Sequence, residues 1–506
     1  MFVKMLSSVR RWRAVFCWPG AGDGAGASLR ALASLKRMRS PGRALMAGLI
    51  LAAAIGNAAA LPASGAKQAA NAAPTYPNIV LIVIDTVRAD HVGCYGYERN
   101  TTSNIDALAN HALLFRNATS AASWTTPSVA ALLSSQYPST MGIYEKPAKL
   151  NTEYPLLAEV LKKQGYRTHG IVSFSYLSNR LGFGRGFDQY DERSHRGHGG
   201  IVAPLVVAKA LKFLKSRPTQ PFFLFVHDFD PHYSYLLHEQ YNYCPEYKGK
   251  VKSGQRIDEM RNMRPSMSAE DIRYIVGLYD SELTYTDMFV AKILQELKRQ
   301  GLYDDAIIVI TADHGEEFME RGWIGHTATL YQELLHVPLI IKLPTNRPGV
   351  VEARVSLVDV MPTLLSYLGL EVPENLEGRV LDLAAPENIA DAPVFSQAKK
   401  LMKSIYYWQR PGPDRVLAKR SVIMGGRKLI YNEATGDKEL YDLRVDPAER
   451  VNRYEEDEAS ARRLEALLNE WISRTEQKGG PQGPEQDENE LFDPEQIRKL
   501  KSLGYM

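Results

Sequence analysis

The segment Asn78-Ile-Val-Leu-Ile-Val-Ile-Asp85 decides the fold of this 506-residue sequence. Its apolar residues are almost all β-branched, and such an unbroken run is typical of a strand covered on both faces in a parallel sheet. The run ends directly in a carboxylate, Asp85. Because ligands of open α/β sheets bind at the carboxyl ends of the strands, Asp85 is the first candidate site residue.

Similar apolar runs recur along the chain and alternate with helical patterns. The runs lie at 167–174, 222–226, 306–310 and 337–341, and helical patterns lie at 204–214 and 269–300. This alternation predicts an α/β fold with a doubly wound, mostly parallel sheet flanked by helices.

Beyond about residue 375 the pattern changes to short polar strands and one amphipathic helix. The strands are expected at 420–424 and 428–432, and the helix at 459–475. We therefore predict a small C-terminal antiparallel α+β subdomain at 376–477. It follows a leader and linker at 1–75 and a catalytic domain at 76–375, and precedes a flexible tail with a short terminal helix at 478–506.

The first 60 residues are typical of a targeting segment. Basic residues at 36–43 precede an apolar run at 44–55, and Ala58-Ala59-Ala60 offers a cleavage site. We expect export to the periplasm or secretion. The run is short for a membrane span, but its retention as a membrane anchor stays open.

The charge balance argues against a nucleic-acid ligand. Although the formal net charge is +3, residues 1–60 hold nine Lys or Arg against one acid, which leaves 52 basic and 57 acidic residues in the remainder. Two cysteines, Cys94 and Cys244, lie beyond the leader. A disulfide between them and two free thiols are both open.

Two strand ends supply candidate metal ligands. Asp85 follows one apolar run, and Asp313 with His314 follows another. A mixed carboxylate and imidazole set suits a hard or borderline divalent cation. Each Asp taken alone has the alternative role of a turn former or a helix cap.

The segment from Ser123 to Leu133 carries a candidate nucleophile. Thr125 and Thr126 lead into a helix that Pro127 opens near its first turn. The positive end of a helix favours a sulfate or phosphate group, and a bound cation would activate the Thr125 hydroxyl. The alternative is that Thr125 merely caps the helix.

Histidines supply candidate proton donors. The segment His227-Asp-Phe-Asp230-Pro231-His232 directly follows a strand, and imidazole can protonate a departing alkoxide near neutral pH. His326, on a predicted loop, is a second proton donor, a second metal ligand or an anion contact. These three roles stay open.

Five segments of the chain together resemble the sulfatase family of the alkaline phosphatase superfamily. They occur in the family's order, at 78–97, at Thr125, at 227–232, at Thr311-Ala-Asp313-His314-Gly315-Glu316, and at 439–447 with Asn452. The resemblance implies an alkaline phosphatase-like fold and a metal-dependent hydrolase of sulfuric or phosphoric esters. It also implies that His232, with His326 as alternate, protonates the leaving alcohol.

The chain departs from the family pattern at the nucleophile. The family reads Cys or Ser, any residue, Pro, any residue, Arg, whereas this chain has Thr125, Pro127 and Val129. Family members convert that Cys or Ser to formylglycine, so no formylglycine is expected here. The usual pair of adjacent Asp residues appears as Asp85-Thr86.

The expected metal ligands Asp85, Thr125, Asp313 and His314 resemble those of phospho-transferring relatives that use a threonine nucleophile. We expect one divalent ion, Ca²⁺, Mn²⁺ or Zn²⁺. The leading hypothesis is a hydrolase of small-molecule, glycan or lipid esters. An envelope phospho-group transferase and a catalytically inactive binding protein are the alternatives. Loops at 180–198 and 233–267 are expected to select the organic part of the substrate.

Overall fold

The computed structural model describes residues 76–143, 148–194, 200–219, 221–327, 329–402, 415–478 and 491–502. The expected leader at 1–75, the tail residues 479–490 and part of the 180–198 loop lie outside these ranges. Within them, every helix falls short of the combined length and hydropathy that a membrane span requires.

An eight-stranded sheet forms the centre of the fold, with the order β10-β2-β9-β6-β1-β5-β3-β4. Its strands are β1 (Ile79–Ile84), β2 (Leu113–Thr119), β3 (Arg167–Ile171), β4 (Gln189–Asp191), β5 (Phe222–Asp228), β6 (Ile307–Ala312), β9 (Leu339–Lys342) and β10 (Gly349–Ser356). All neighbouring pairs are parallel except the two that β9 makes. The predicted doubly wound, mostly parallel sheet is confirmed.

The run at 337–341 forms β9, which is antiparallel to both of its neighbours, β6 and β2. A parallel neighbour of β6 would need a crossover connection of a dozen or more residues, usually a long helix. The connection from β6 to β9, residues 313–338, is long enough for a crossover, but its described residues form only the short β7 (Glu317–Phe318), β8 (Ile324–Gly325) and α8 (Gln332–Leu335) and not a long crossover helix. Apolar composition alone predicted a strand but not its direction.

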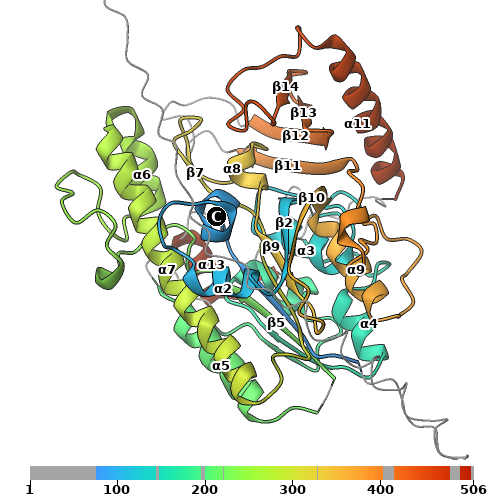
Figure 1. The fold of residues 1–506 in the computed structure, drawn as a ribbon. Helices are drawn as coiled ribbons and strands as arrows, with labels where there is room; N and C mark the ends of the chain where they lie inside the picture. The colour runs from blue at the N-terminus through green and yellow to red at the C-terminus, as the bar shows by residue number, and fades with distance from the viewer. Residues whose placement is uncertain are drawn as a thin grey trace, which may run out of the picture. The chain divides into compact units, whose positions relative to one another are not determined.

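Strand β1 is buried along its whole length, with every side chain at most 1% exposed. Figure 1 shows α5 (Ala203–Lys215) and α7 (Ala269–Arg299) on one side of the sheet, and α3 (Thr125–Ser134), α4 (Leu157–Lys163) and α9 (Val360–Tyr367) on the other. Because helices cover both faces, neither set of alternating side chains reaches water. This explains the unbroken apolar run.

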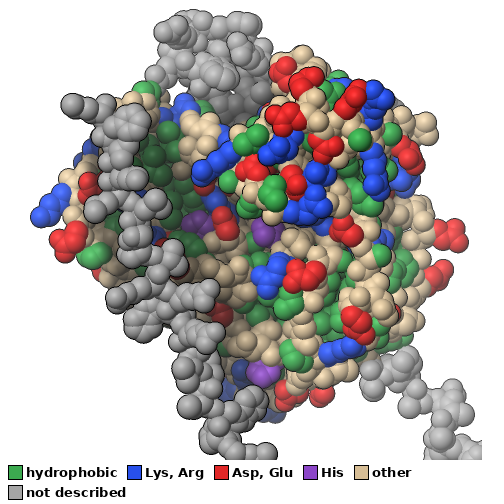
Figure 2. Space-filling model, turned by 45° about the horizontal axis from the view of Figure 1, so that its top comes forward, with side chains coloured by type: hydrophobic (Ala, Val, Ile, Leu, Met, Phe, Trp, Pro, Cys, Tyr) green, Lys and Arg blue, Asp and Glu red, His purple; other side chains and the backbone are tan. Residues whose placement is uncertain are grey.

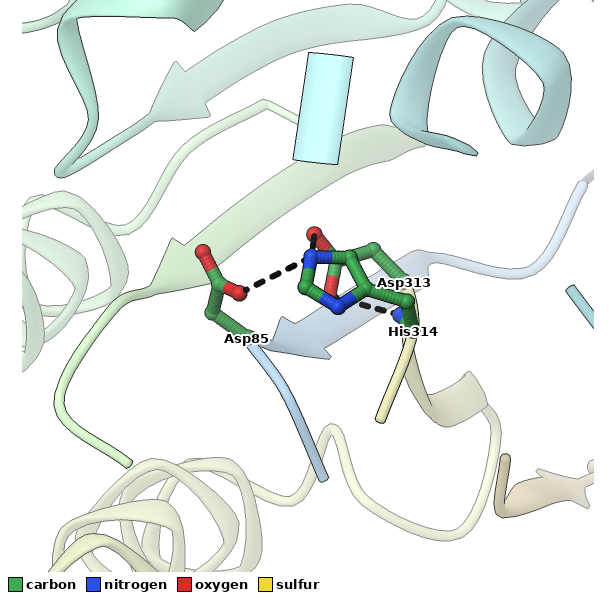
Figure 3. A group of neighbouring side chains, drawn as sticks. All are labelled: Asp85, Asp313 and His314. Carbon is green, nitrogen blue, oxygen red and sulfur yellow. Dashed lines mark hydrogen bonds and ion pairs between the residues drawn. The ribbon is translucent and has the colours of Figure 1, made fainter. Parts of the chain in front are cut away.

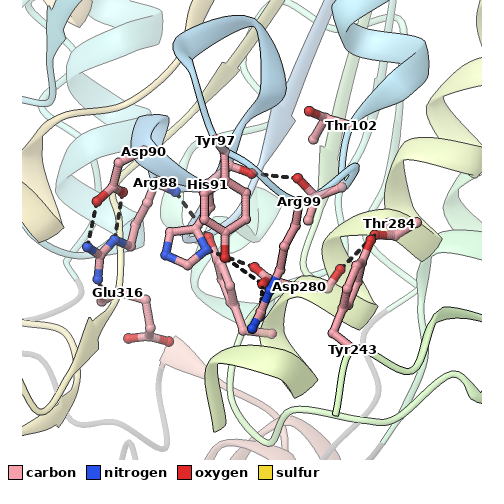
Figure 4. A network of polar contacts seen from close by, with 12 residues as sticks. Arg88, Asp90, His91, Tyr97, Arg99, Thr102, Tyr243, Asp280, Thr284 and Glu316 are labelled. Carbon is pink, nitrogen blue, oxygen red and sulfur yellow. Dashed lines mark hydrogen bonds and ion pairs between the residues drawn. The ribbon is translucent and has the colours of Figure 1, made fainter. Parts of the chain in front are cut away.

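The loop after β1 is held against α7 by one buried carboxylate. Asp280 accepts hydrogen bonds from His91 Nδ1 at 2.8 Å, from the Tyr97 hydroxyl at 2.6 Å and from Arg99 Nη1 at 2.6 Å (Figure 4). Asp280 itself is fully buried. A charge-assisted network of this kind fixes the loop that leads away from the strand end.

A second sheet of four antiparallel strands forms the C-terminal part. It contains β11 (Val394–Met402), β12 (Arg415–Met424), β13 (Arg427–Asn432) and β14 (Lys438–Asp442), and α11 (Glu458–Lys478) packs on β12 and β13. The small antiparallel subdomain is confirmed, although the sequence indicated only its two middle strands and the helix.

The C-terminal part shares a core with the large sheet's helices. Trp471 of α11 is 1% exposed, stacks on Phe395 at 4.9 Å between ring centroids, and meets Tyr137 edge-on at 5.0 Å. Tyr137 follows α3. Farther along the chain, residues next to and in α13 (Pro494–Ser502) join the main core, including Phe492 and Leu500.

The surface charge bears on the expected absence of a nucleic-acid ligand, and the state of the two cysteines bears on the possible disulfide. On the face seen in Figure 2, Lys and Arg side chains alternate with Asp and Glu, so that face shows no continuous basic surface. Cys94 and Cys244 are both free thiols.

We predict that Trp471→Ala lowers the free energy of unfolding by about 3–5 kcal/mol, because a large buried ring is lost and the cavity closes only in part. Urea unfolding followed by circular dichroism measures it. Glu470→Ala, at an exposed position of the same helix, is the control and should change stability by at most about 0.5 kcal/mol. Equal shifts for both variants would contradict the proposed packing role.

Candidate active site

The register of the central strands brings two carboxylates together. Ile84 at the end of β1 pairs with Asp228 of β5 on one side and with Ala312 of β6 on the other. The residues that follow, Asp85 and Asp313, therefore leave the sheet at the same level. Asp85, Asp313 and His314 each offer a ligand atom within 4.8 Å of the others, and all three are buried (Figure 3).

Each carboxylate keeps one oxygen without a hydrogen bond. Asp313 Oδ1 accepts from the backbone N–H of Thr86 at 3.2 Å and of His314 at 2.9 Å, whereas Asp313 Oδ2 has no hydrogen-bond partner. Asp85 Oδ1 also has none. Buried carboxylate oxygens without donors are costly, and a divalent cation between them removes that cost.

The electrostatics of the carboxylates support the same interpretation. Burial raises the pKa of the Asp85 carboxyl well above its usual range, and the charges of Asp313 and Glu316 raise it further. Burial acts in the same sense on Asp313, but His314 and His227 outweigh it and hold the pKa of Asp313 below its usual value. The residues present thus fit a divalent cation.

His314 is held in the tautomer that a metal ligand requires. Its Nδ1 donates to the carbonyl oxygen of Gly315 at 2.8 Å, so Nε2 keeps its lone pair. That Nε2 lies 3.5 Å from Asp85 Oδ1 and 3.7 Å from Asp313 Oδ2. Figure 3 shows its ring turned toward both carboxylates.

The backbone after Asp85 is strained. Thr86 has φ 59°, in the left-handed region that a β-branched residue rarely adopts. This conformation directs the Thr86 amide to Asp313 Oδ1 and leaves Oδ2 for another partner. Strain of this kind persists where the surrounding structure supports it, often at functional sites.

Thr125 is the first residue of α3, and its hydroxyl faces the carboxylates. Thr125 Oγ1 lies 3.3 Å from Asp85 Oδ2 and 3.3 Å from His314 Nε2. The N-cap residue is Trp124, which makes no side-chain capping bond. The structure therefore does not use the Thr125 hydroxyl as a helix cap, which was the alternative reading of the sequence. Amides of the first helical turn lack intrahelical acceptors and lie beside this hydroxyl.

The loop that carries His326 is tied to the segment before α3. The backbone N–H of Thr327 donates to the Ser123 carbonyl oxygen at 3.0 Å, and Ser123 Oγ donates to the Thr327 carbonyl oxygen at 3.2 Å. His326 Nδ1 lies 2.9 Å from Glu316 Oε1. The ring of His326 lies 4.4 Å from that of His314.

His232 lies beside His326, with 4.9 Å between the ring centroids. Its Nδ1 donates to the Tyr233 carbonyl oxygen at 2.8 Å, and Phe229 stacks on its other side at 4.1 Å. Burial holds the pKa of His232 well below its usual range. All six residues singled out in the sequence, Asp85, Thr125, His232, Asp313, His314 and His326, therefore gather at one end of the sheet.

Two further residues belong to this site and were not among the predicted metal ligands. His227 Nε2 lies 3.8 Å from Asp85 Oδ2 and 3.9 Å from Asp313 Oδ2, and neither ring nitrogen has a hydrogen-bond partner. The other is Glu316, which contacts His326. The pairing of β5 with β1 is what places His227 at the site, and Glu316 is indicated by its position two residues after His314.

Family models and curated proteins match most of the chain. A family model described as Sulfatase matches residues 77–370, and one described as N-sulphoglucosamine sulphohydrolase, C-terminal, matches 319–478. The chain is 23% identical to the N-acetylglucosamine-6-O-sulfatase of Bacteroides thetaiotaomicron, over 82% of this chain and 89% of that protein.

Two solved structures share the fold. A 2-O GAG sulfatase is similar with a TM-score of 0.65 and 20% identity, over 79% of this chain and 92% of the other. The phosphonate monoester hydrolase of Agrobacterium radiobacter is similar with a TM-score of 0.62 and 20% identity, over 79% of this chain and 96% of the other.

We predict that Asp313→Asn weakens binding of a divalent cation at least about tenfold, because removing a direct ligand costs no less than removing its supporting partner. Metal content after gel filtration, measured by mass spectrometry, tests this. The exposed Asp305→Asn, just before β6, is the control and should retain wild-type metal.

The same variant tests the electrostatics independently of metal affinity. Since His314 and His227 hold the pKa of Asp313 below its usual value, its carboxylate stabilises the metal-free fold at neutral pH, and metal-free Asp313→Asn should melt below wild type in excess chelator, by less as the pH falls toward that pKa. A variant that binds metal as wild type does would exclude the proposed site, and one that melts above wild type at neutral pH in chelator would contradict this electrostatic account.

Proposed function

The chain belongs to the sulfatase family, and on that premise we propose that this ester hydrolase uses Thr125 as its nucleophile and a buried histidine as its general acid. The observation that carries the proposal is the position of the Thr125 hydroxyl. It lies at the start of α3, within 3.3 Å of both Asp85 Oδ2 and His314 Nε2. Thr125, Pro127 and Val129 replace the family's formylglycine-forming segment, so the side chain acts as an alcohol.

Asp85, Asp313, His314 and the Thr125 hydroxyl would hold one divalent cation, and His227 is within reach of both carboxylates. When bound, the cation would polarise the ester and lower the pKa of the hydroxyl. Thr86 in place of a second Asp, together with His314, favours Mn²⁺ or Zn²⁺ over Ca²⁺.

In the first step, Thr125 Oγ attacks the sulfur or phosphorus atom in line with the bond to the leaving oxygen. The Oγ–S or Oγ–P bond forms, the bond to the alcohol oxygen breaks, and the hydroxyl proton passes to a nearby base. Amides at the start of α3 and the helix dipole stabilise the charge that develops on the equatorial oxygens. In the second step, water cleaves the threonine ester and releases the anion.

The leaving alkoxide needs a proton, and two histidines are near enough to supply it. His232 is the donor that the family resemblance implies, but its burial favours the neutral ring. His326 has Glu316 on Nδ1, and burial raises the pKa of Glu316 to about 8, so the Glu316–His326 pair retains a proton at neutral pH. We therefore propose His326 as the donor, with His232 as a neighbouring hydrogen-bond partner of the substrate.

The substrate proposed is a sulfate ester of a sugar. Support comes from the relative named N-acetylglucosamine-6-O-sulfatase, while the structural neighbour named phosphonate monoester hydrolase keeps phosphorus esters as the second class. A threonine nucleophile also suits transfer of a phospho group to an acceptor alcohol. We further propose that the chain is exported, as residues 36–60 predict.

We predict that Thr125→Ala lowers kcat at least about 10³-fold, because removal of a nucleophile eliminates the covalent step. Turnover of 4-nitrophenyl sulfate, phosphate monoester and phosphodiester with added Ca²⁺, Mn²⁺ or Zn²⁺ measures it and ranks the ester classes. Thr126→Ala, at the next buried position, is the matched control and should stay near wild type. An unchanged rate for Thr125→Ala would exclude Thr125, and metal binding without turnover of any ester would favour the transferase or the binding protein.

The dependence of kcat/KM on the leaving group identifies the general acid. His326→Gln should lower kcat/KM about 10²- to 10⁴-fold for an alkyl or sugar sulfate, whose alkoxide requires protonation, and far less for 4-nitrophenyl sulfate. His232→Gln should affect both substrates to a similar degree. If His232→Gln shows the selective loss instead, the proton comes from His232.

A further inference from the structure

A cavity of about 440 Å³ lies beside the loop at 443–450 of the C-terminal part. Arg88, Arg321, Gln332, Arg354 and Arg450 are among the residues that line it. None of the proposed metal ligands does. The cavity is therefore separate from the reaction centre.

Most charged side chains of this cavity are already paired. Arg88 forms two hydrogen bonds with the Asp90 carboxylate, at 2.9 and 2.8 Å (Figure 4). A third contact joins Arg88 to Glu320 at 2.5 Å. Arg321 Nε donates to Glu333 Oε1 at 3.0 Å. The opposite charges in these pairs neutralise each other, so Arg88 and Arg321 do not require an anionic ligand.

Arg354 is the exception. It lies on β10, is 9% exposed, and its guanidinium makes no hydrogen bond or ion pair with any residue that the structure describes. Of the two acids that act on it from a distance, Glu449 is already paired with Lys428 at 2.7 Å, and Asp391 accepts backbone N–H groups, from Arg354 at 2.9 Å and from Gly425 at 3.1 Å. A buried cation without a partner is destabilising unless an anion approaches it.

Gln332 supplies a second donor to the same cavity. Its Nε2 is buried and has no hydrogen-bond acceptor among the described residues. A guanidinium presents a planar set of N–H groups that matches the oxygens of a sulfate, phosphate or carboxylate. Two donors without acceptors in one cavity therefore call for an acceptor-rich, negatively charged ligand.

We propose that this cavity binds an oxyanion of the sulfate class, held by the Arg354 guanidinium and the Gln332 amide. Its volume lies within the range of small-molecule sites, about 300–1,000 Å³, so it accommodates a sulfate ester carried by one sugar as well as free sulfate. The proposal does not depend on Thr125 or on a metal, because no residue of the reaction centre takes part.

The test compares the melting temperatures of wild type, Arg354→Met and Arg354→Lys in chloride and in millimolar sulfate at constant ionic strength. Without sulfate, Arg354→Met should melt at or above wild type, because an unpaired buried charge is replaced by an apolar side chain of similar size. Sulfate should raise the wild-type melting temperature saturably, Arg354→Lys less, and Arg354→Met only as much as general salt effects and the reaction centre allow.

Arg273→Met, at an exposed position of α7 outside the cavity, is the control and should respond to sulfate as wild type does. Equal sulfate responses in wild type and Arg354→Met would overturn the proposal. A crystal of the wild-type protein soaked in selenate gives a second, independent readout. Anomalous density beside the Arg354 guanidinium supports the site, and density at the reaction centre alone overturns it.

The source of the oxyanion follows from comparing two probes, inorganic sulfate and galactose 6-sulfate. Half-saturation at a lower concentration of the sulfated sugar would assign the cavity to a sugar sulfate, as in a neighbouring unit of a sulfated glycan. Half-saturation at a lower concentration of inorganic sulfate would assign it to the free anion that a sulfatase releases. If neither probe gives a response that Arg354→Met abolishes, the proposal that this cavity binds an oxyanion is overturned.

Discussion

The structure depends on two buried carboxylates that three adjacent strands force together. β5, β1 and β6 end at one level, so Asp85 and Asp313 emerge side by side, and neither forms an ion pair with a Lys or Arg among the described residues. Like charges this close destabilise a fold unless something positive comes between them. The neighbouring structure is arranged around that requirement. Thr86 takes a strained backbone conformation, and His314 presents a lone pair instead of an N–H.

The reacting group is then brought to the carboxylates by elements that are distant in sequence. α3 directs its first residue, Thr125, at Asp85, and the loop at His326 is pinned to Ser123 just before that helix. The proposed nucleophile is thus positioned by the start of a helix, and the loop of the proposed proton donor by hydrogen bonds to Ser123. In the proposed reaction, such preorganisation lets the helix amides and the buried histidines act on developing charge without first moving.

Sequence patterns predicted the centre of the fold and most of the site because both follow from local rules. The apolar run at 78–85 predicted a central strand, and polar residues directly after two such runs predicted the grouping of Asp85, Asp313 and His314. His227 could not be assigned in this way, because only the pairing of β5 with β1 turns its ring toward the carboxylates. The direction of β9 depends on the structure of its connection to β6, which forms no long crossover helix among the described residues, and the unpaired state of Arg354 depends on contacts between distant segments. Neither has a local signature.

The separation of the two carboxylates along the chain has a consequence for how the protein folds. The backbone contact between Thr86 and Asp313 joins residues 227 positions apart, across the interface where β6 docks against β1. Long-range strand pairing of this kind is slow to form. A partly folded chain without β6 offers a cation only half of its ligands, so a metal ion would gain little by binding early. Its binding energy would instead stabilise only the completed sheet, in which β6 is docked against β1.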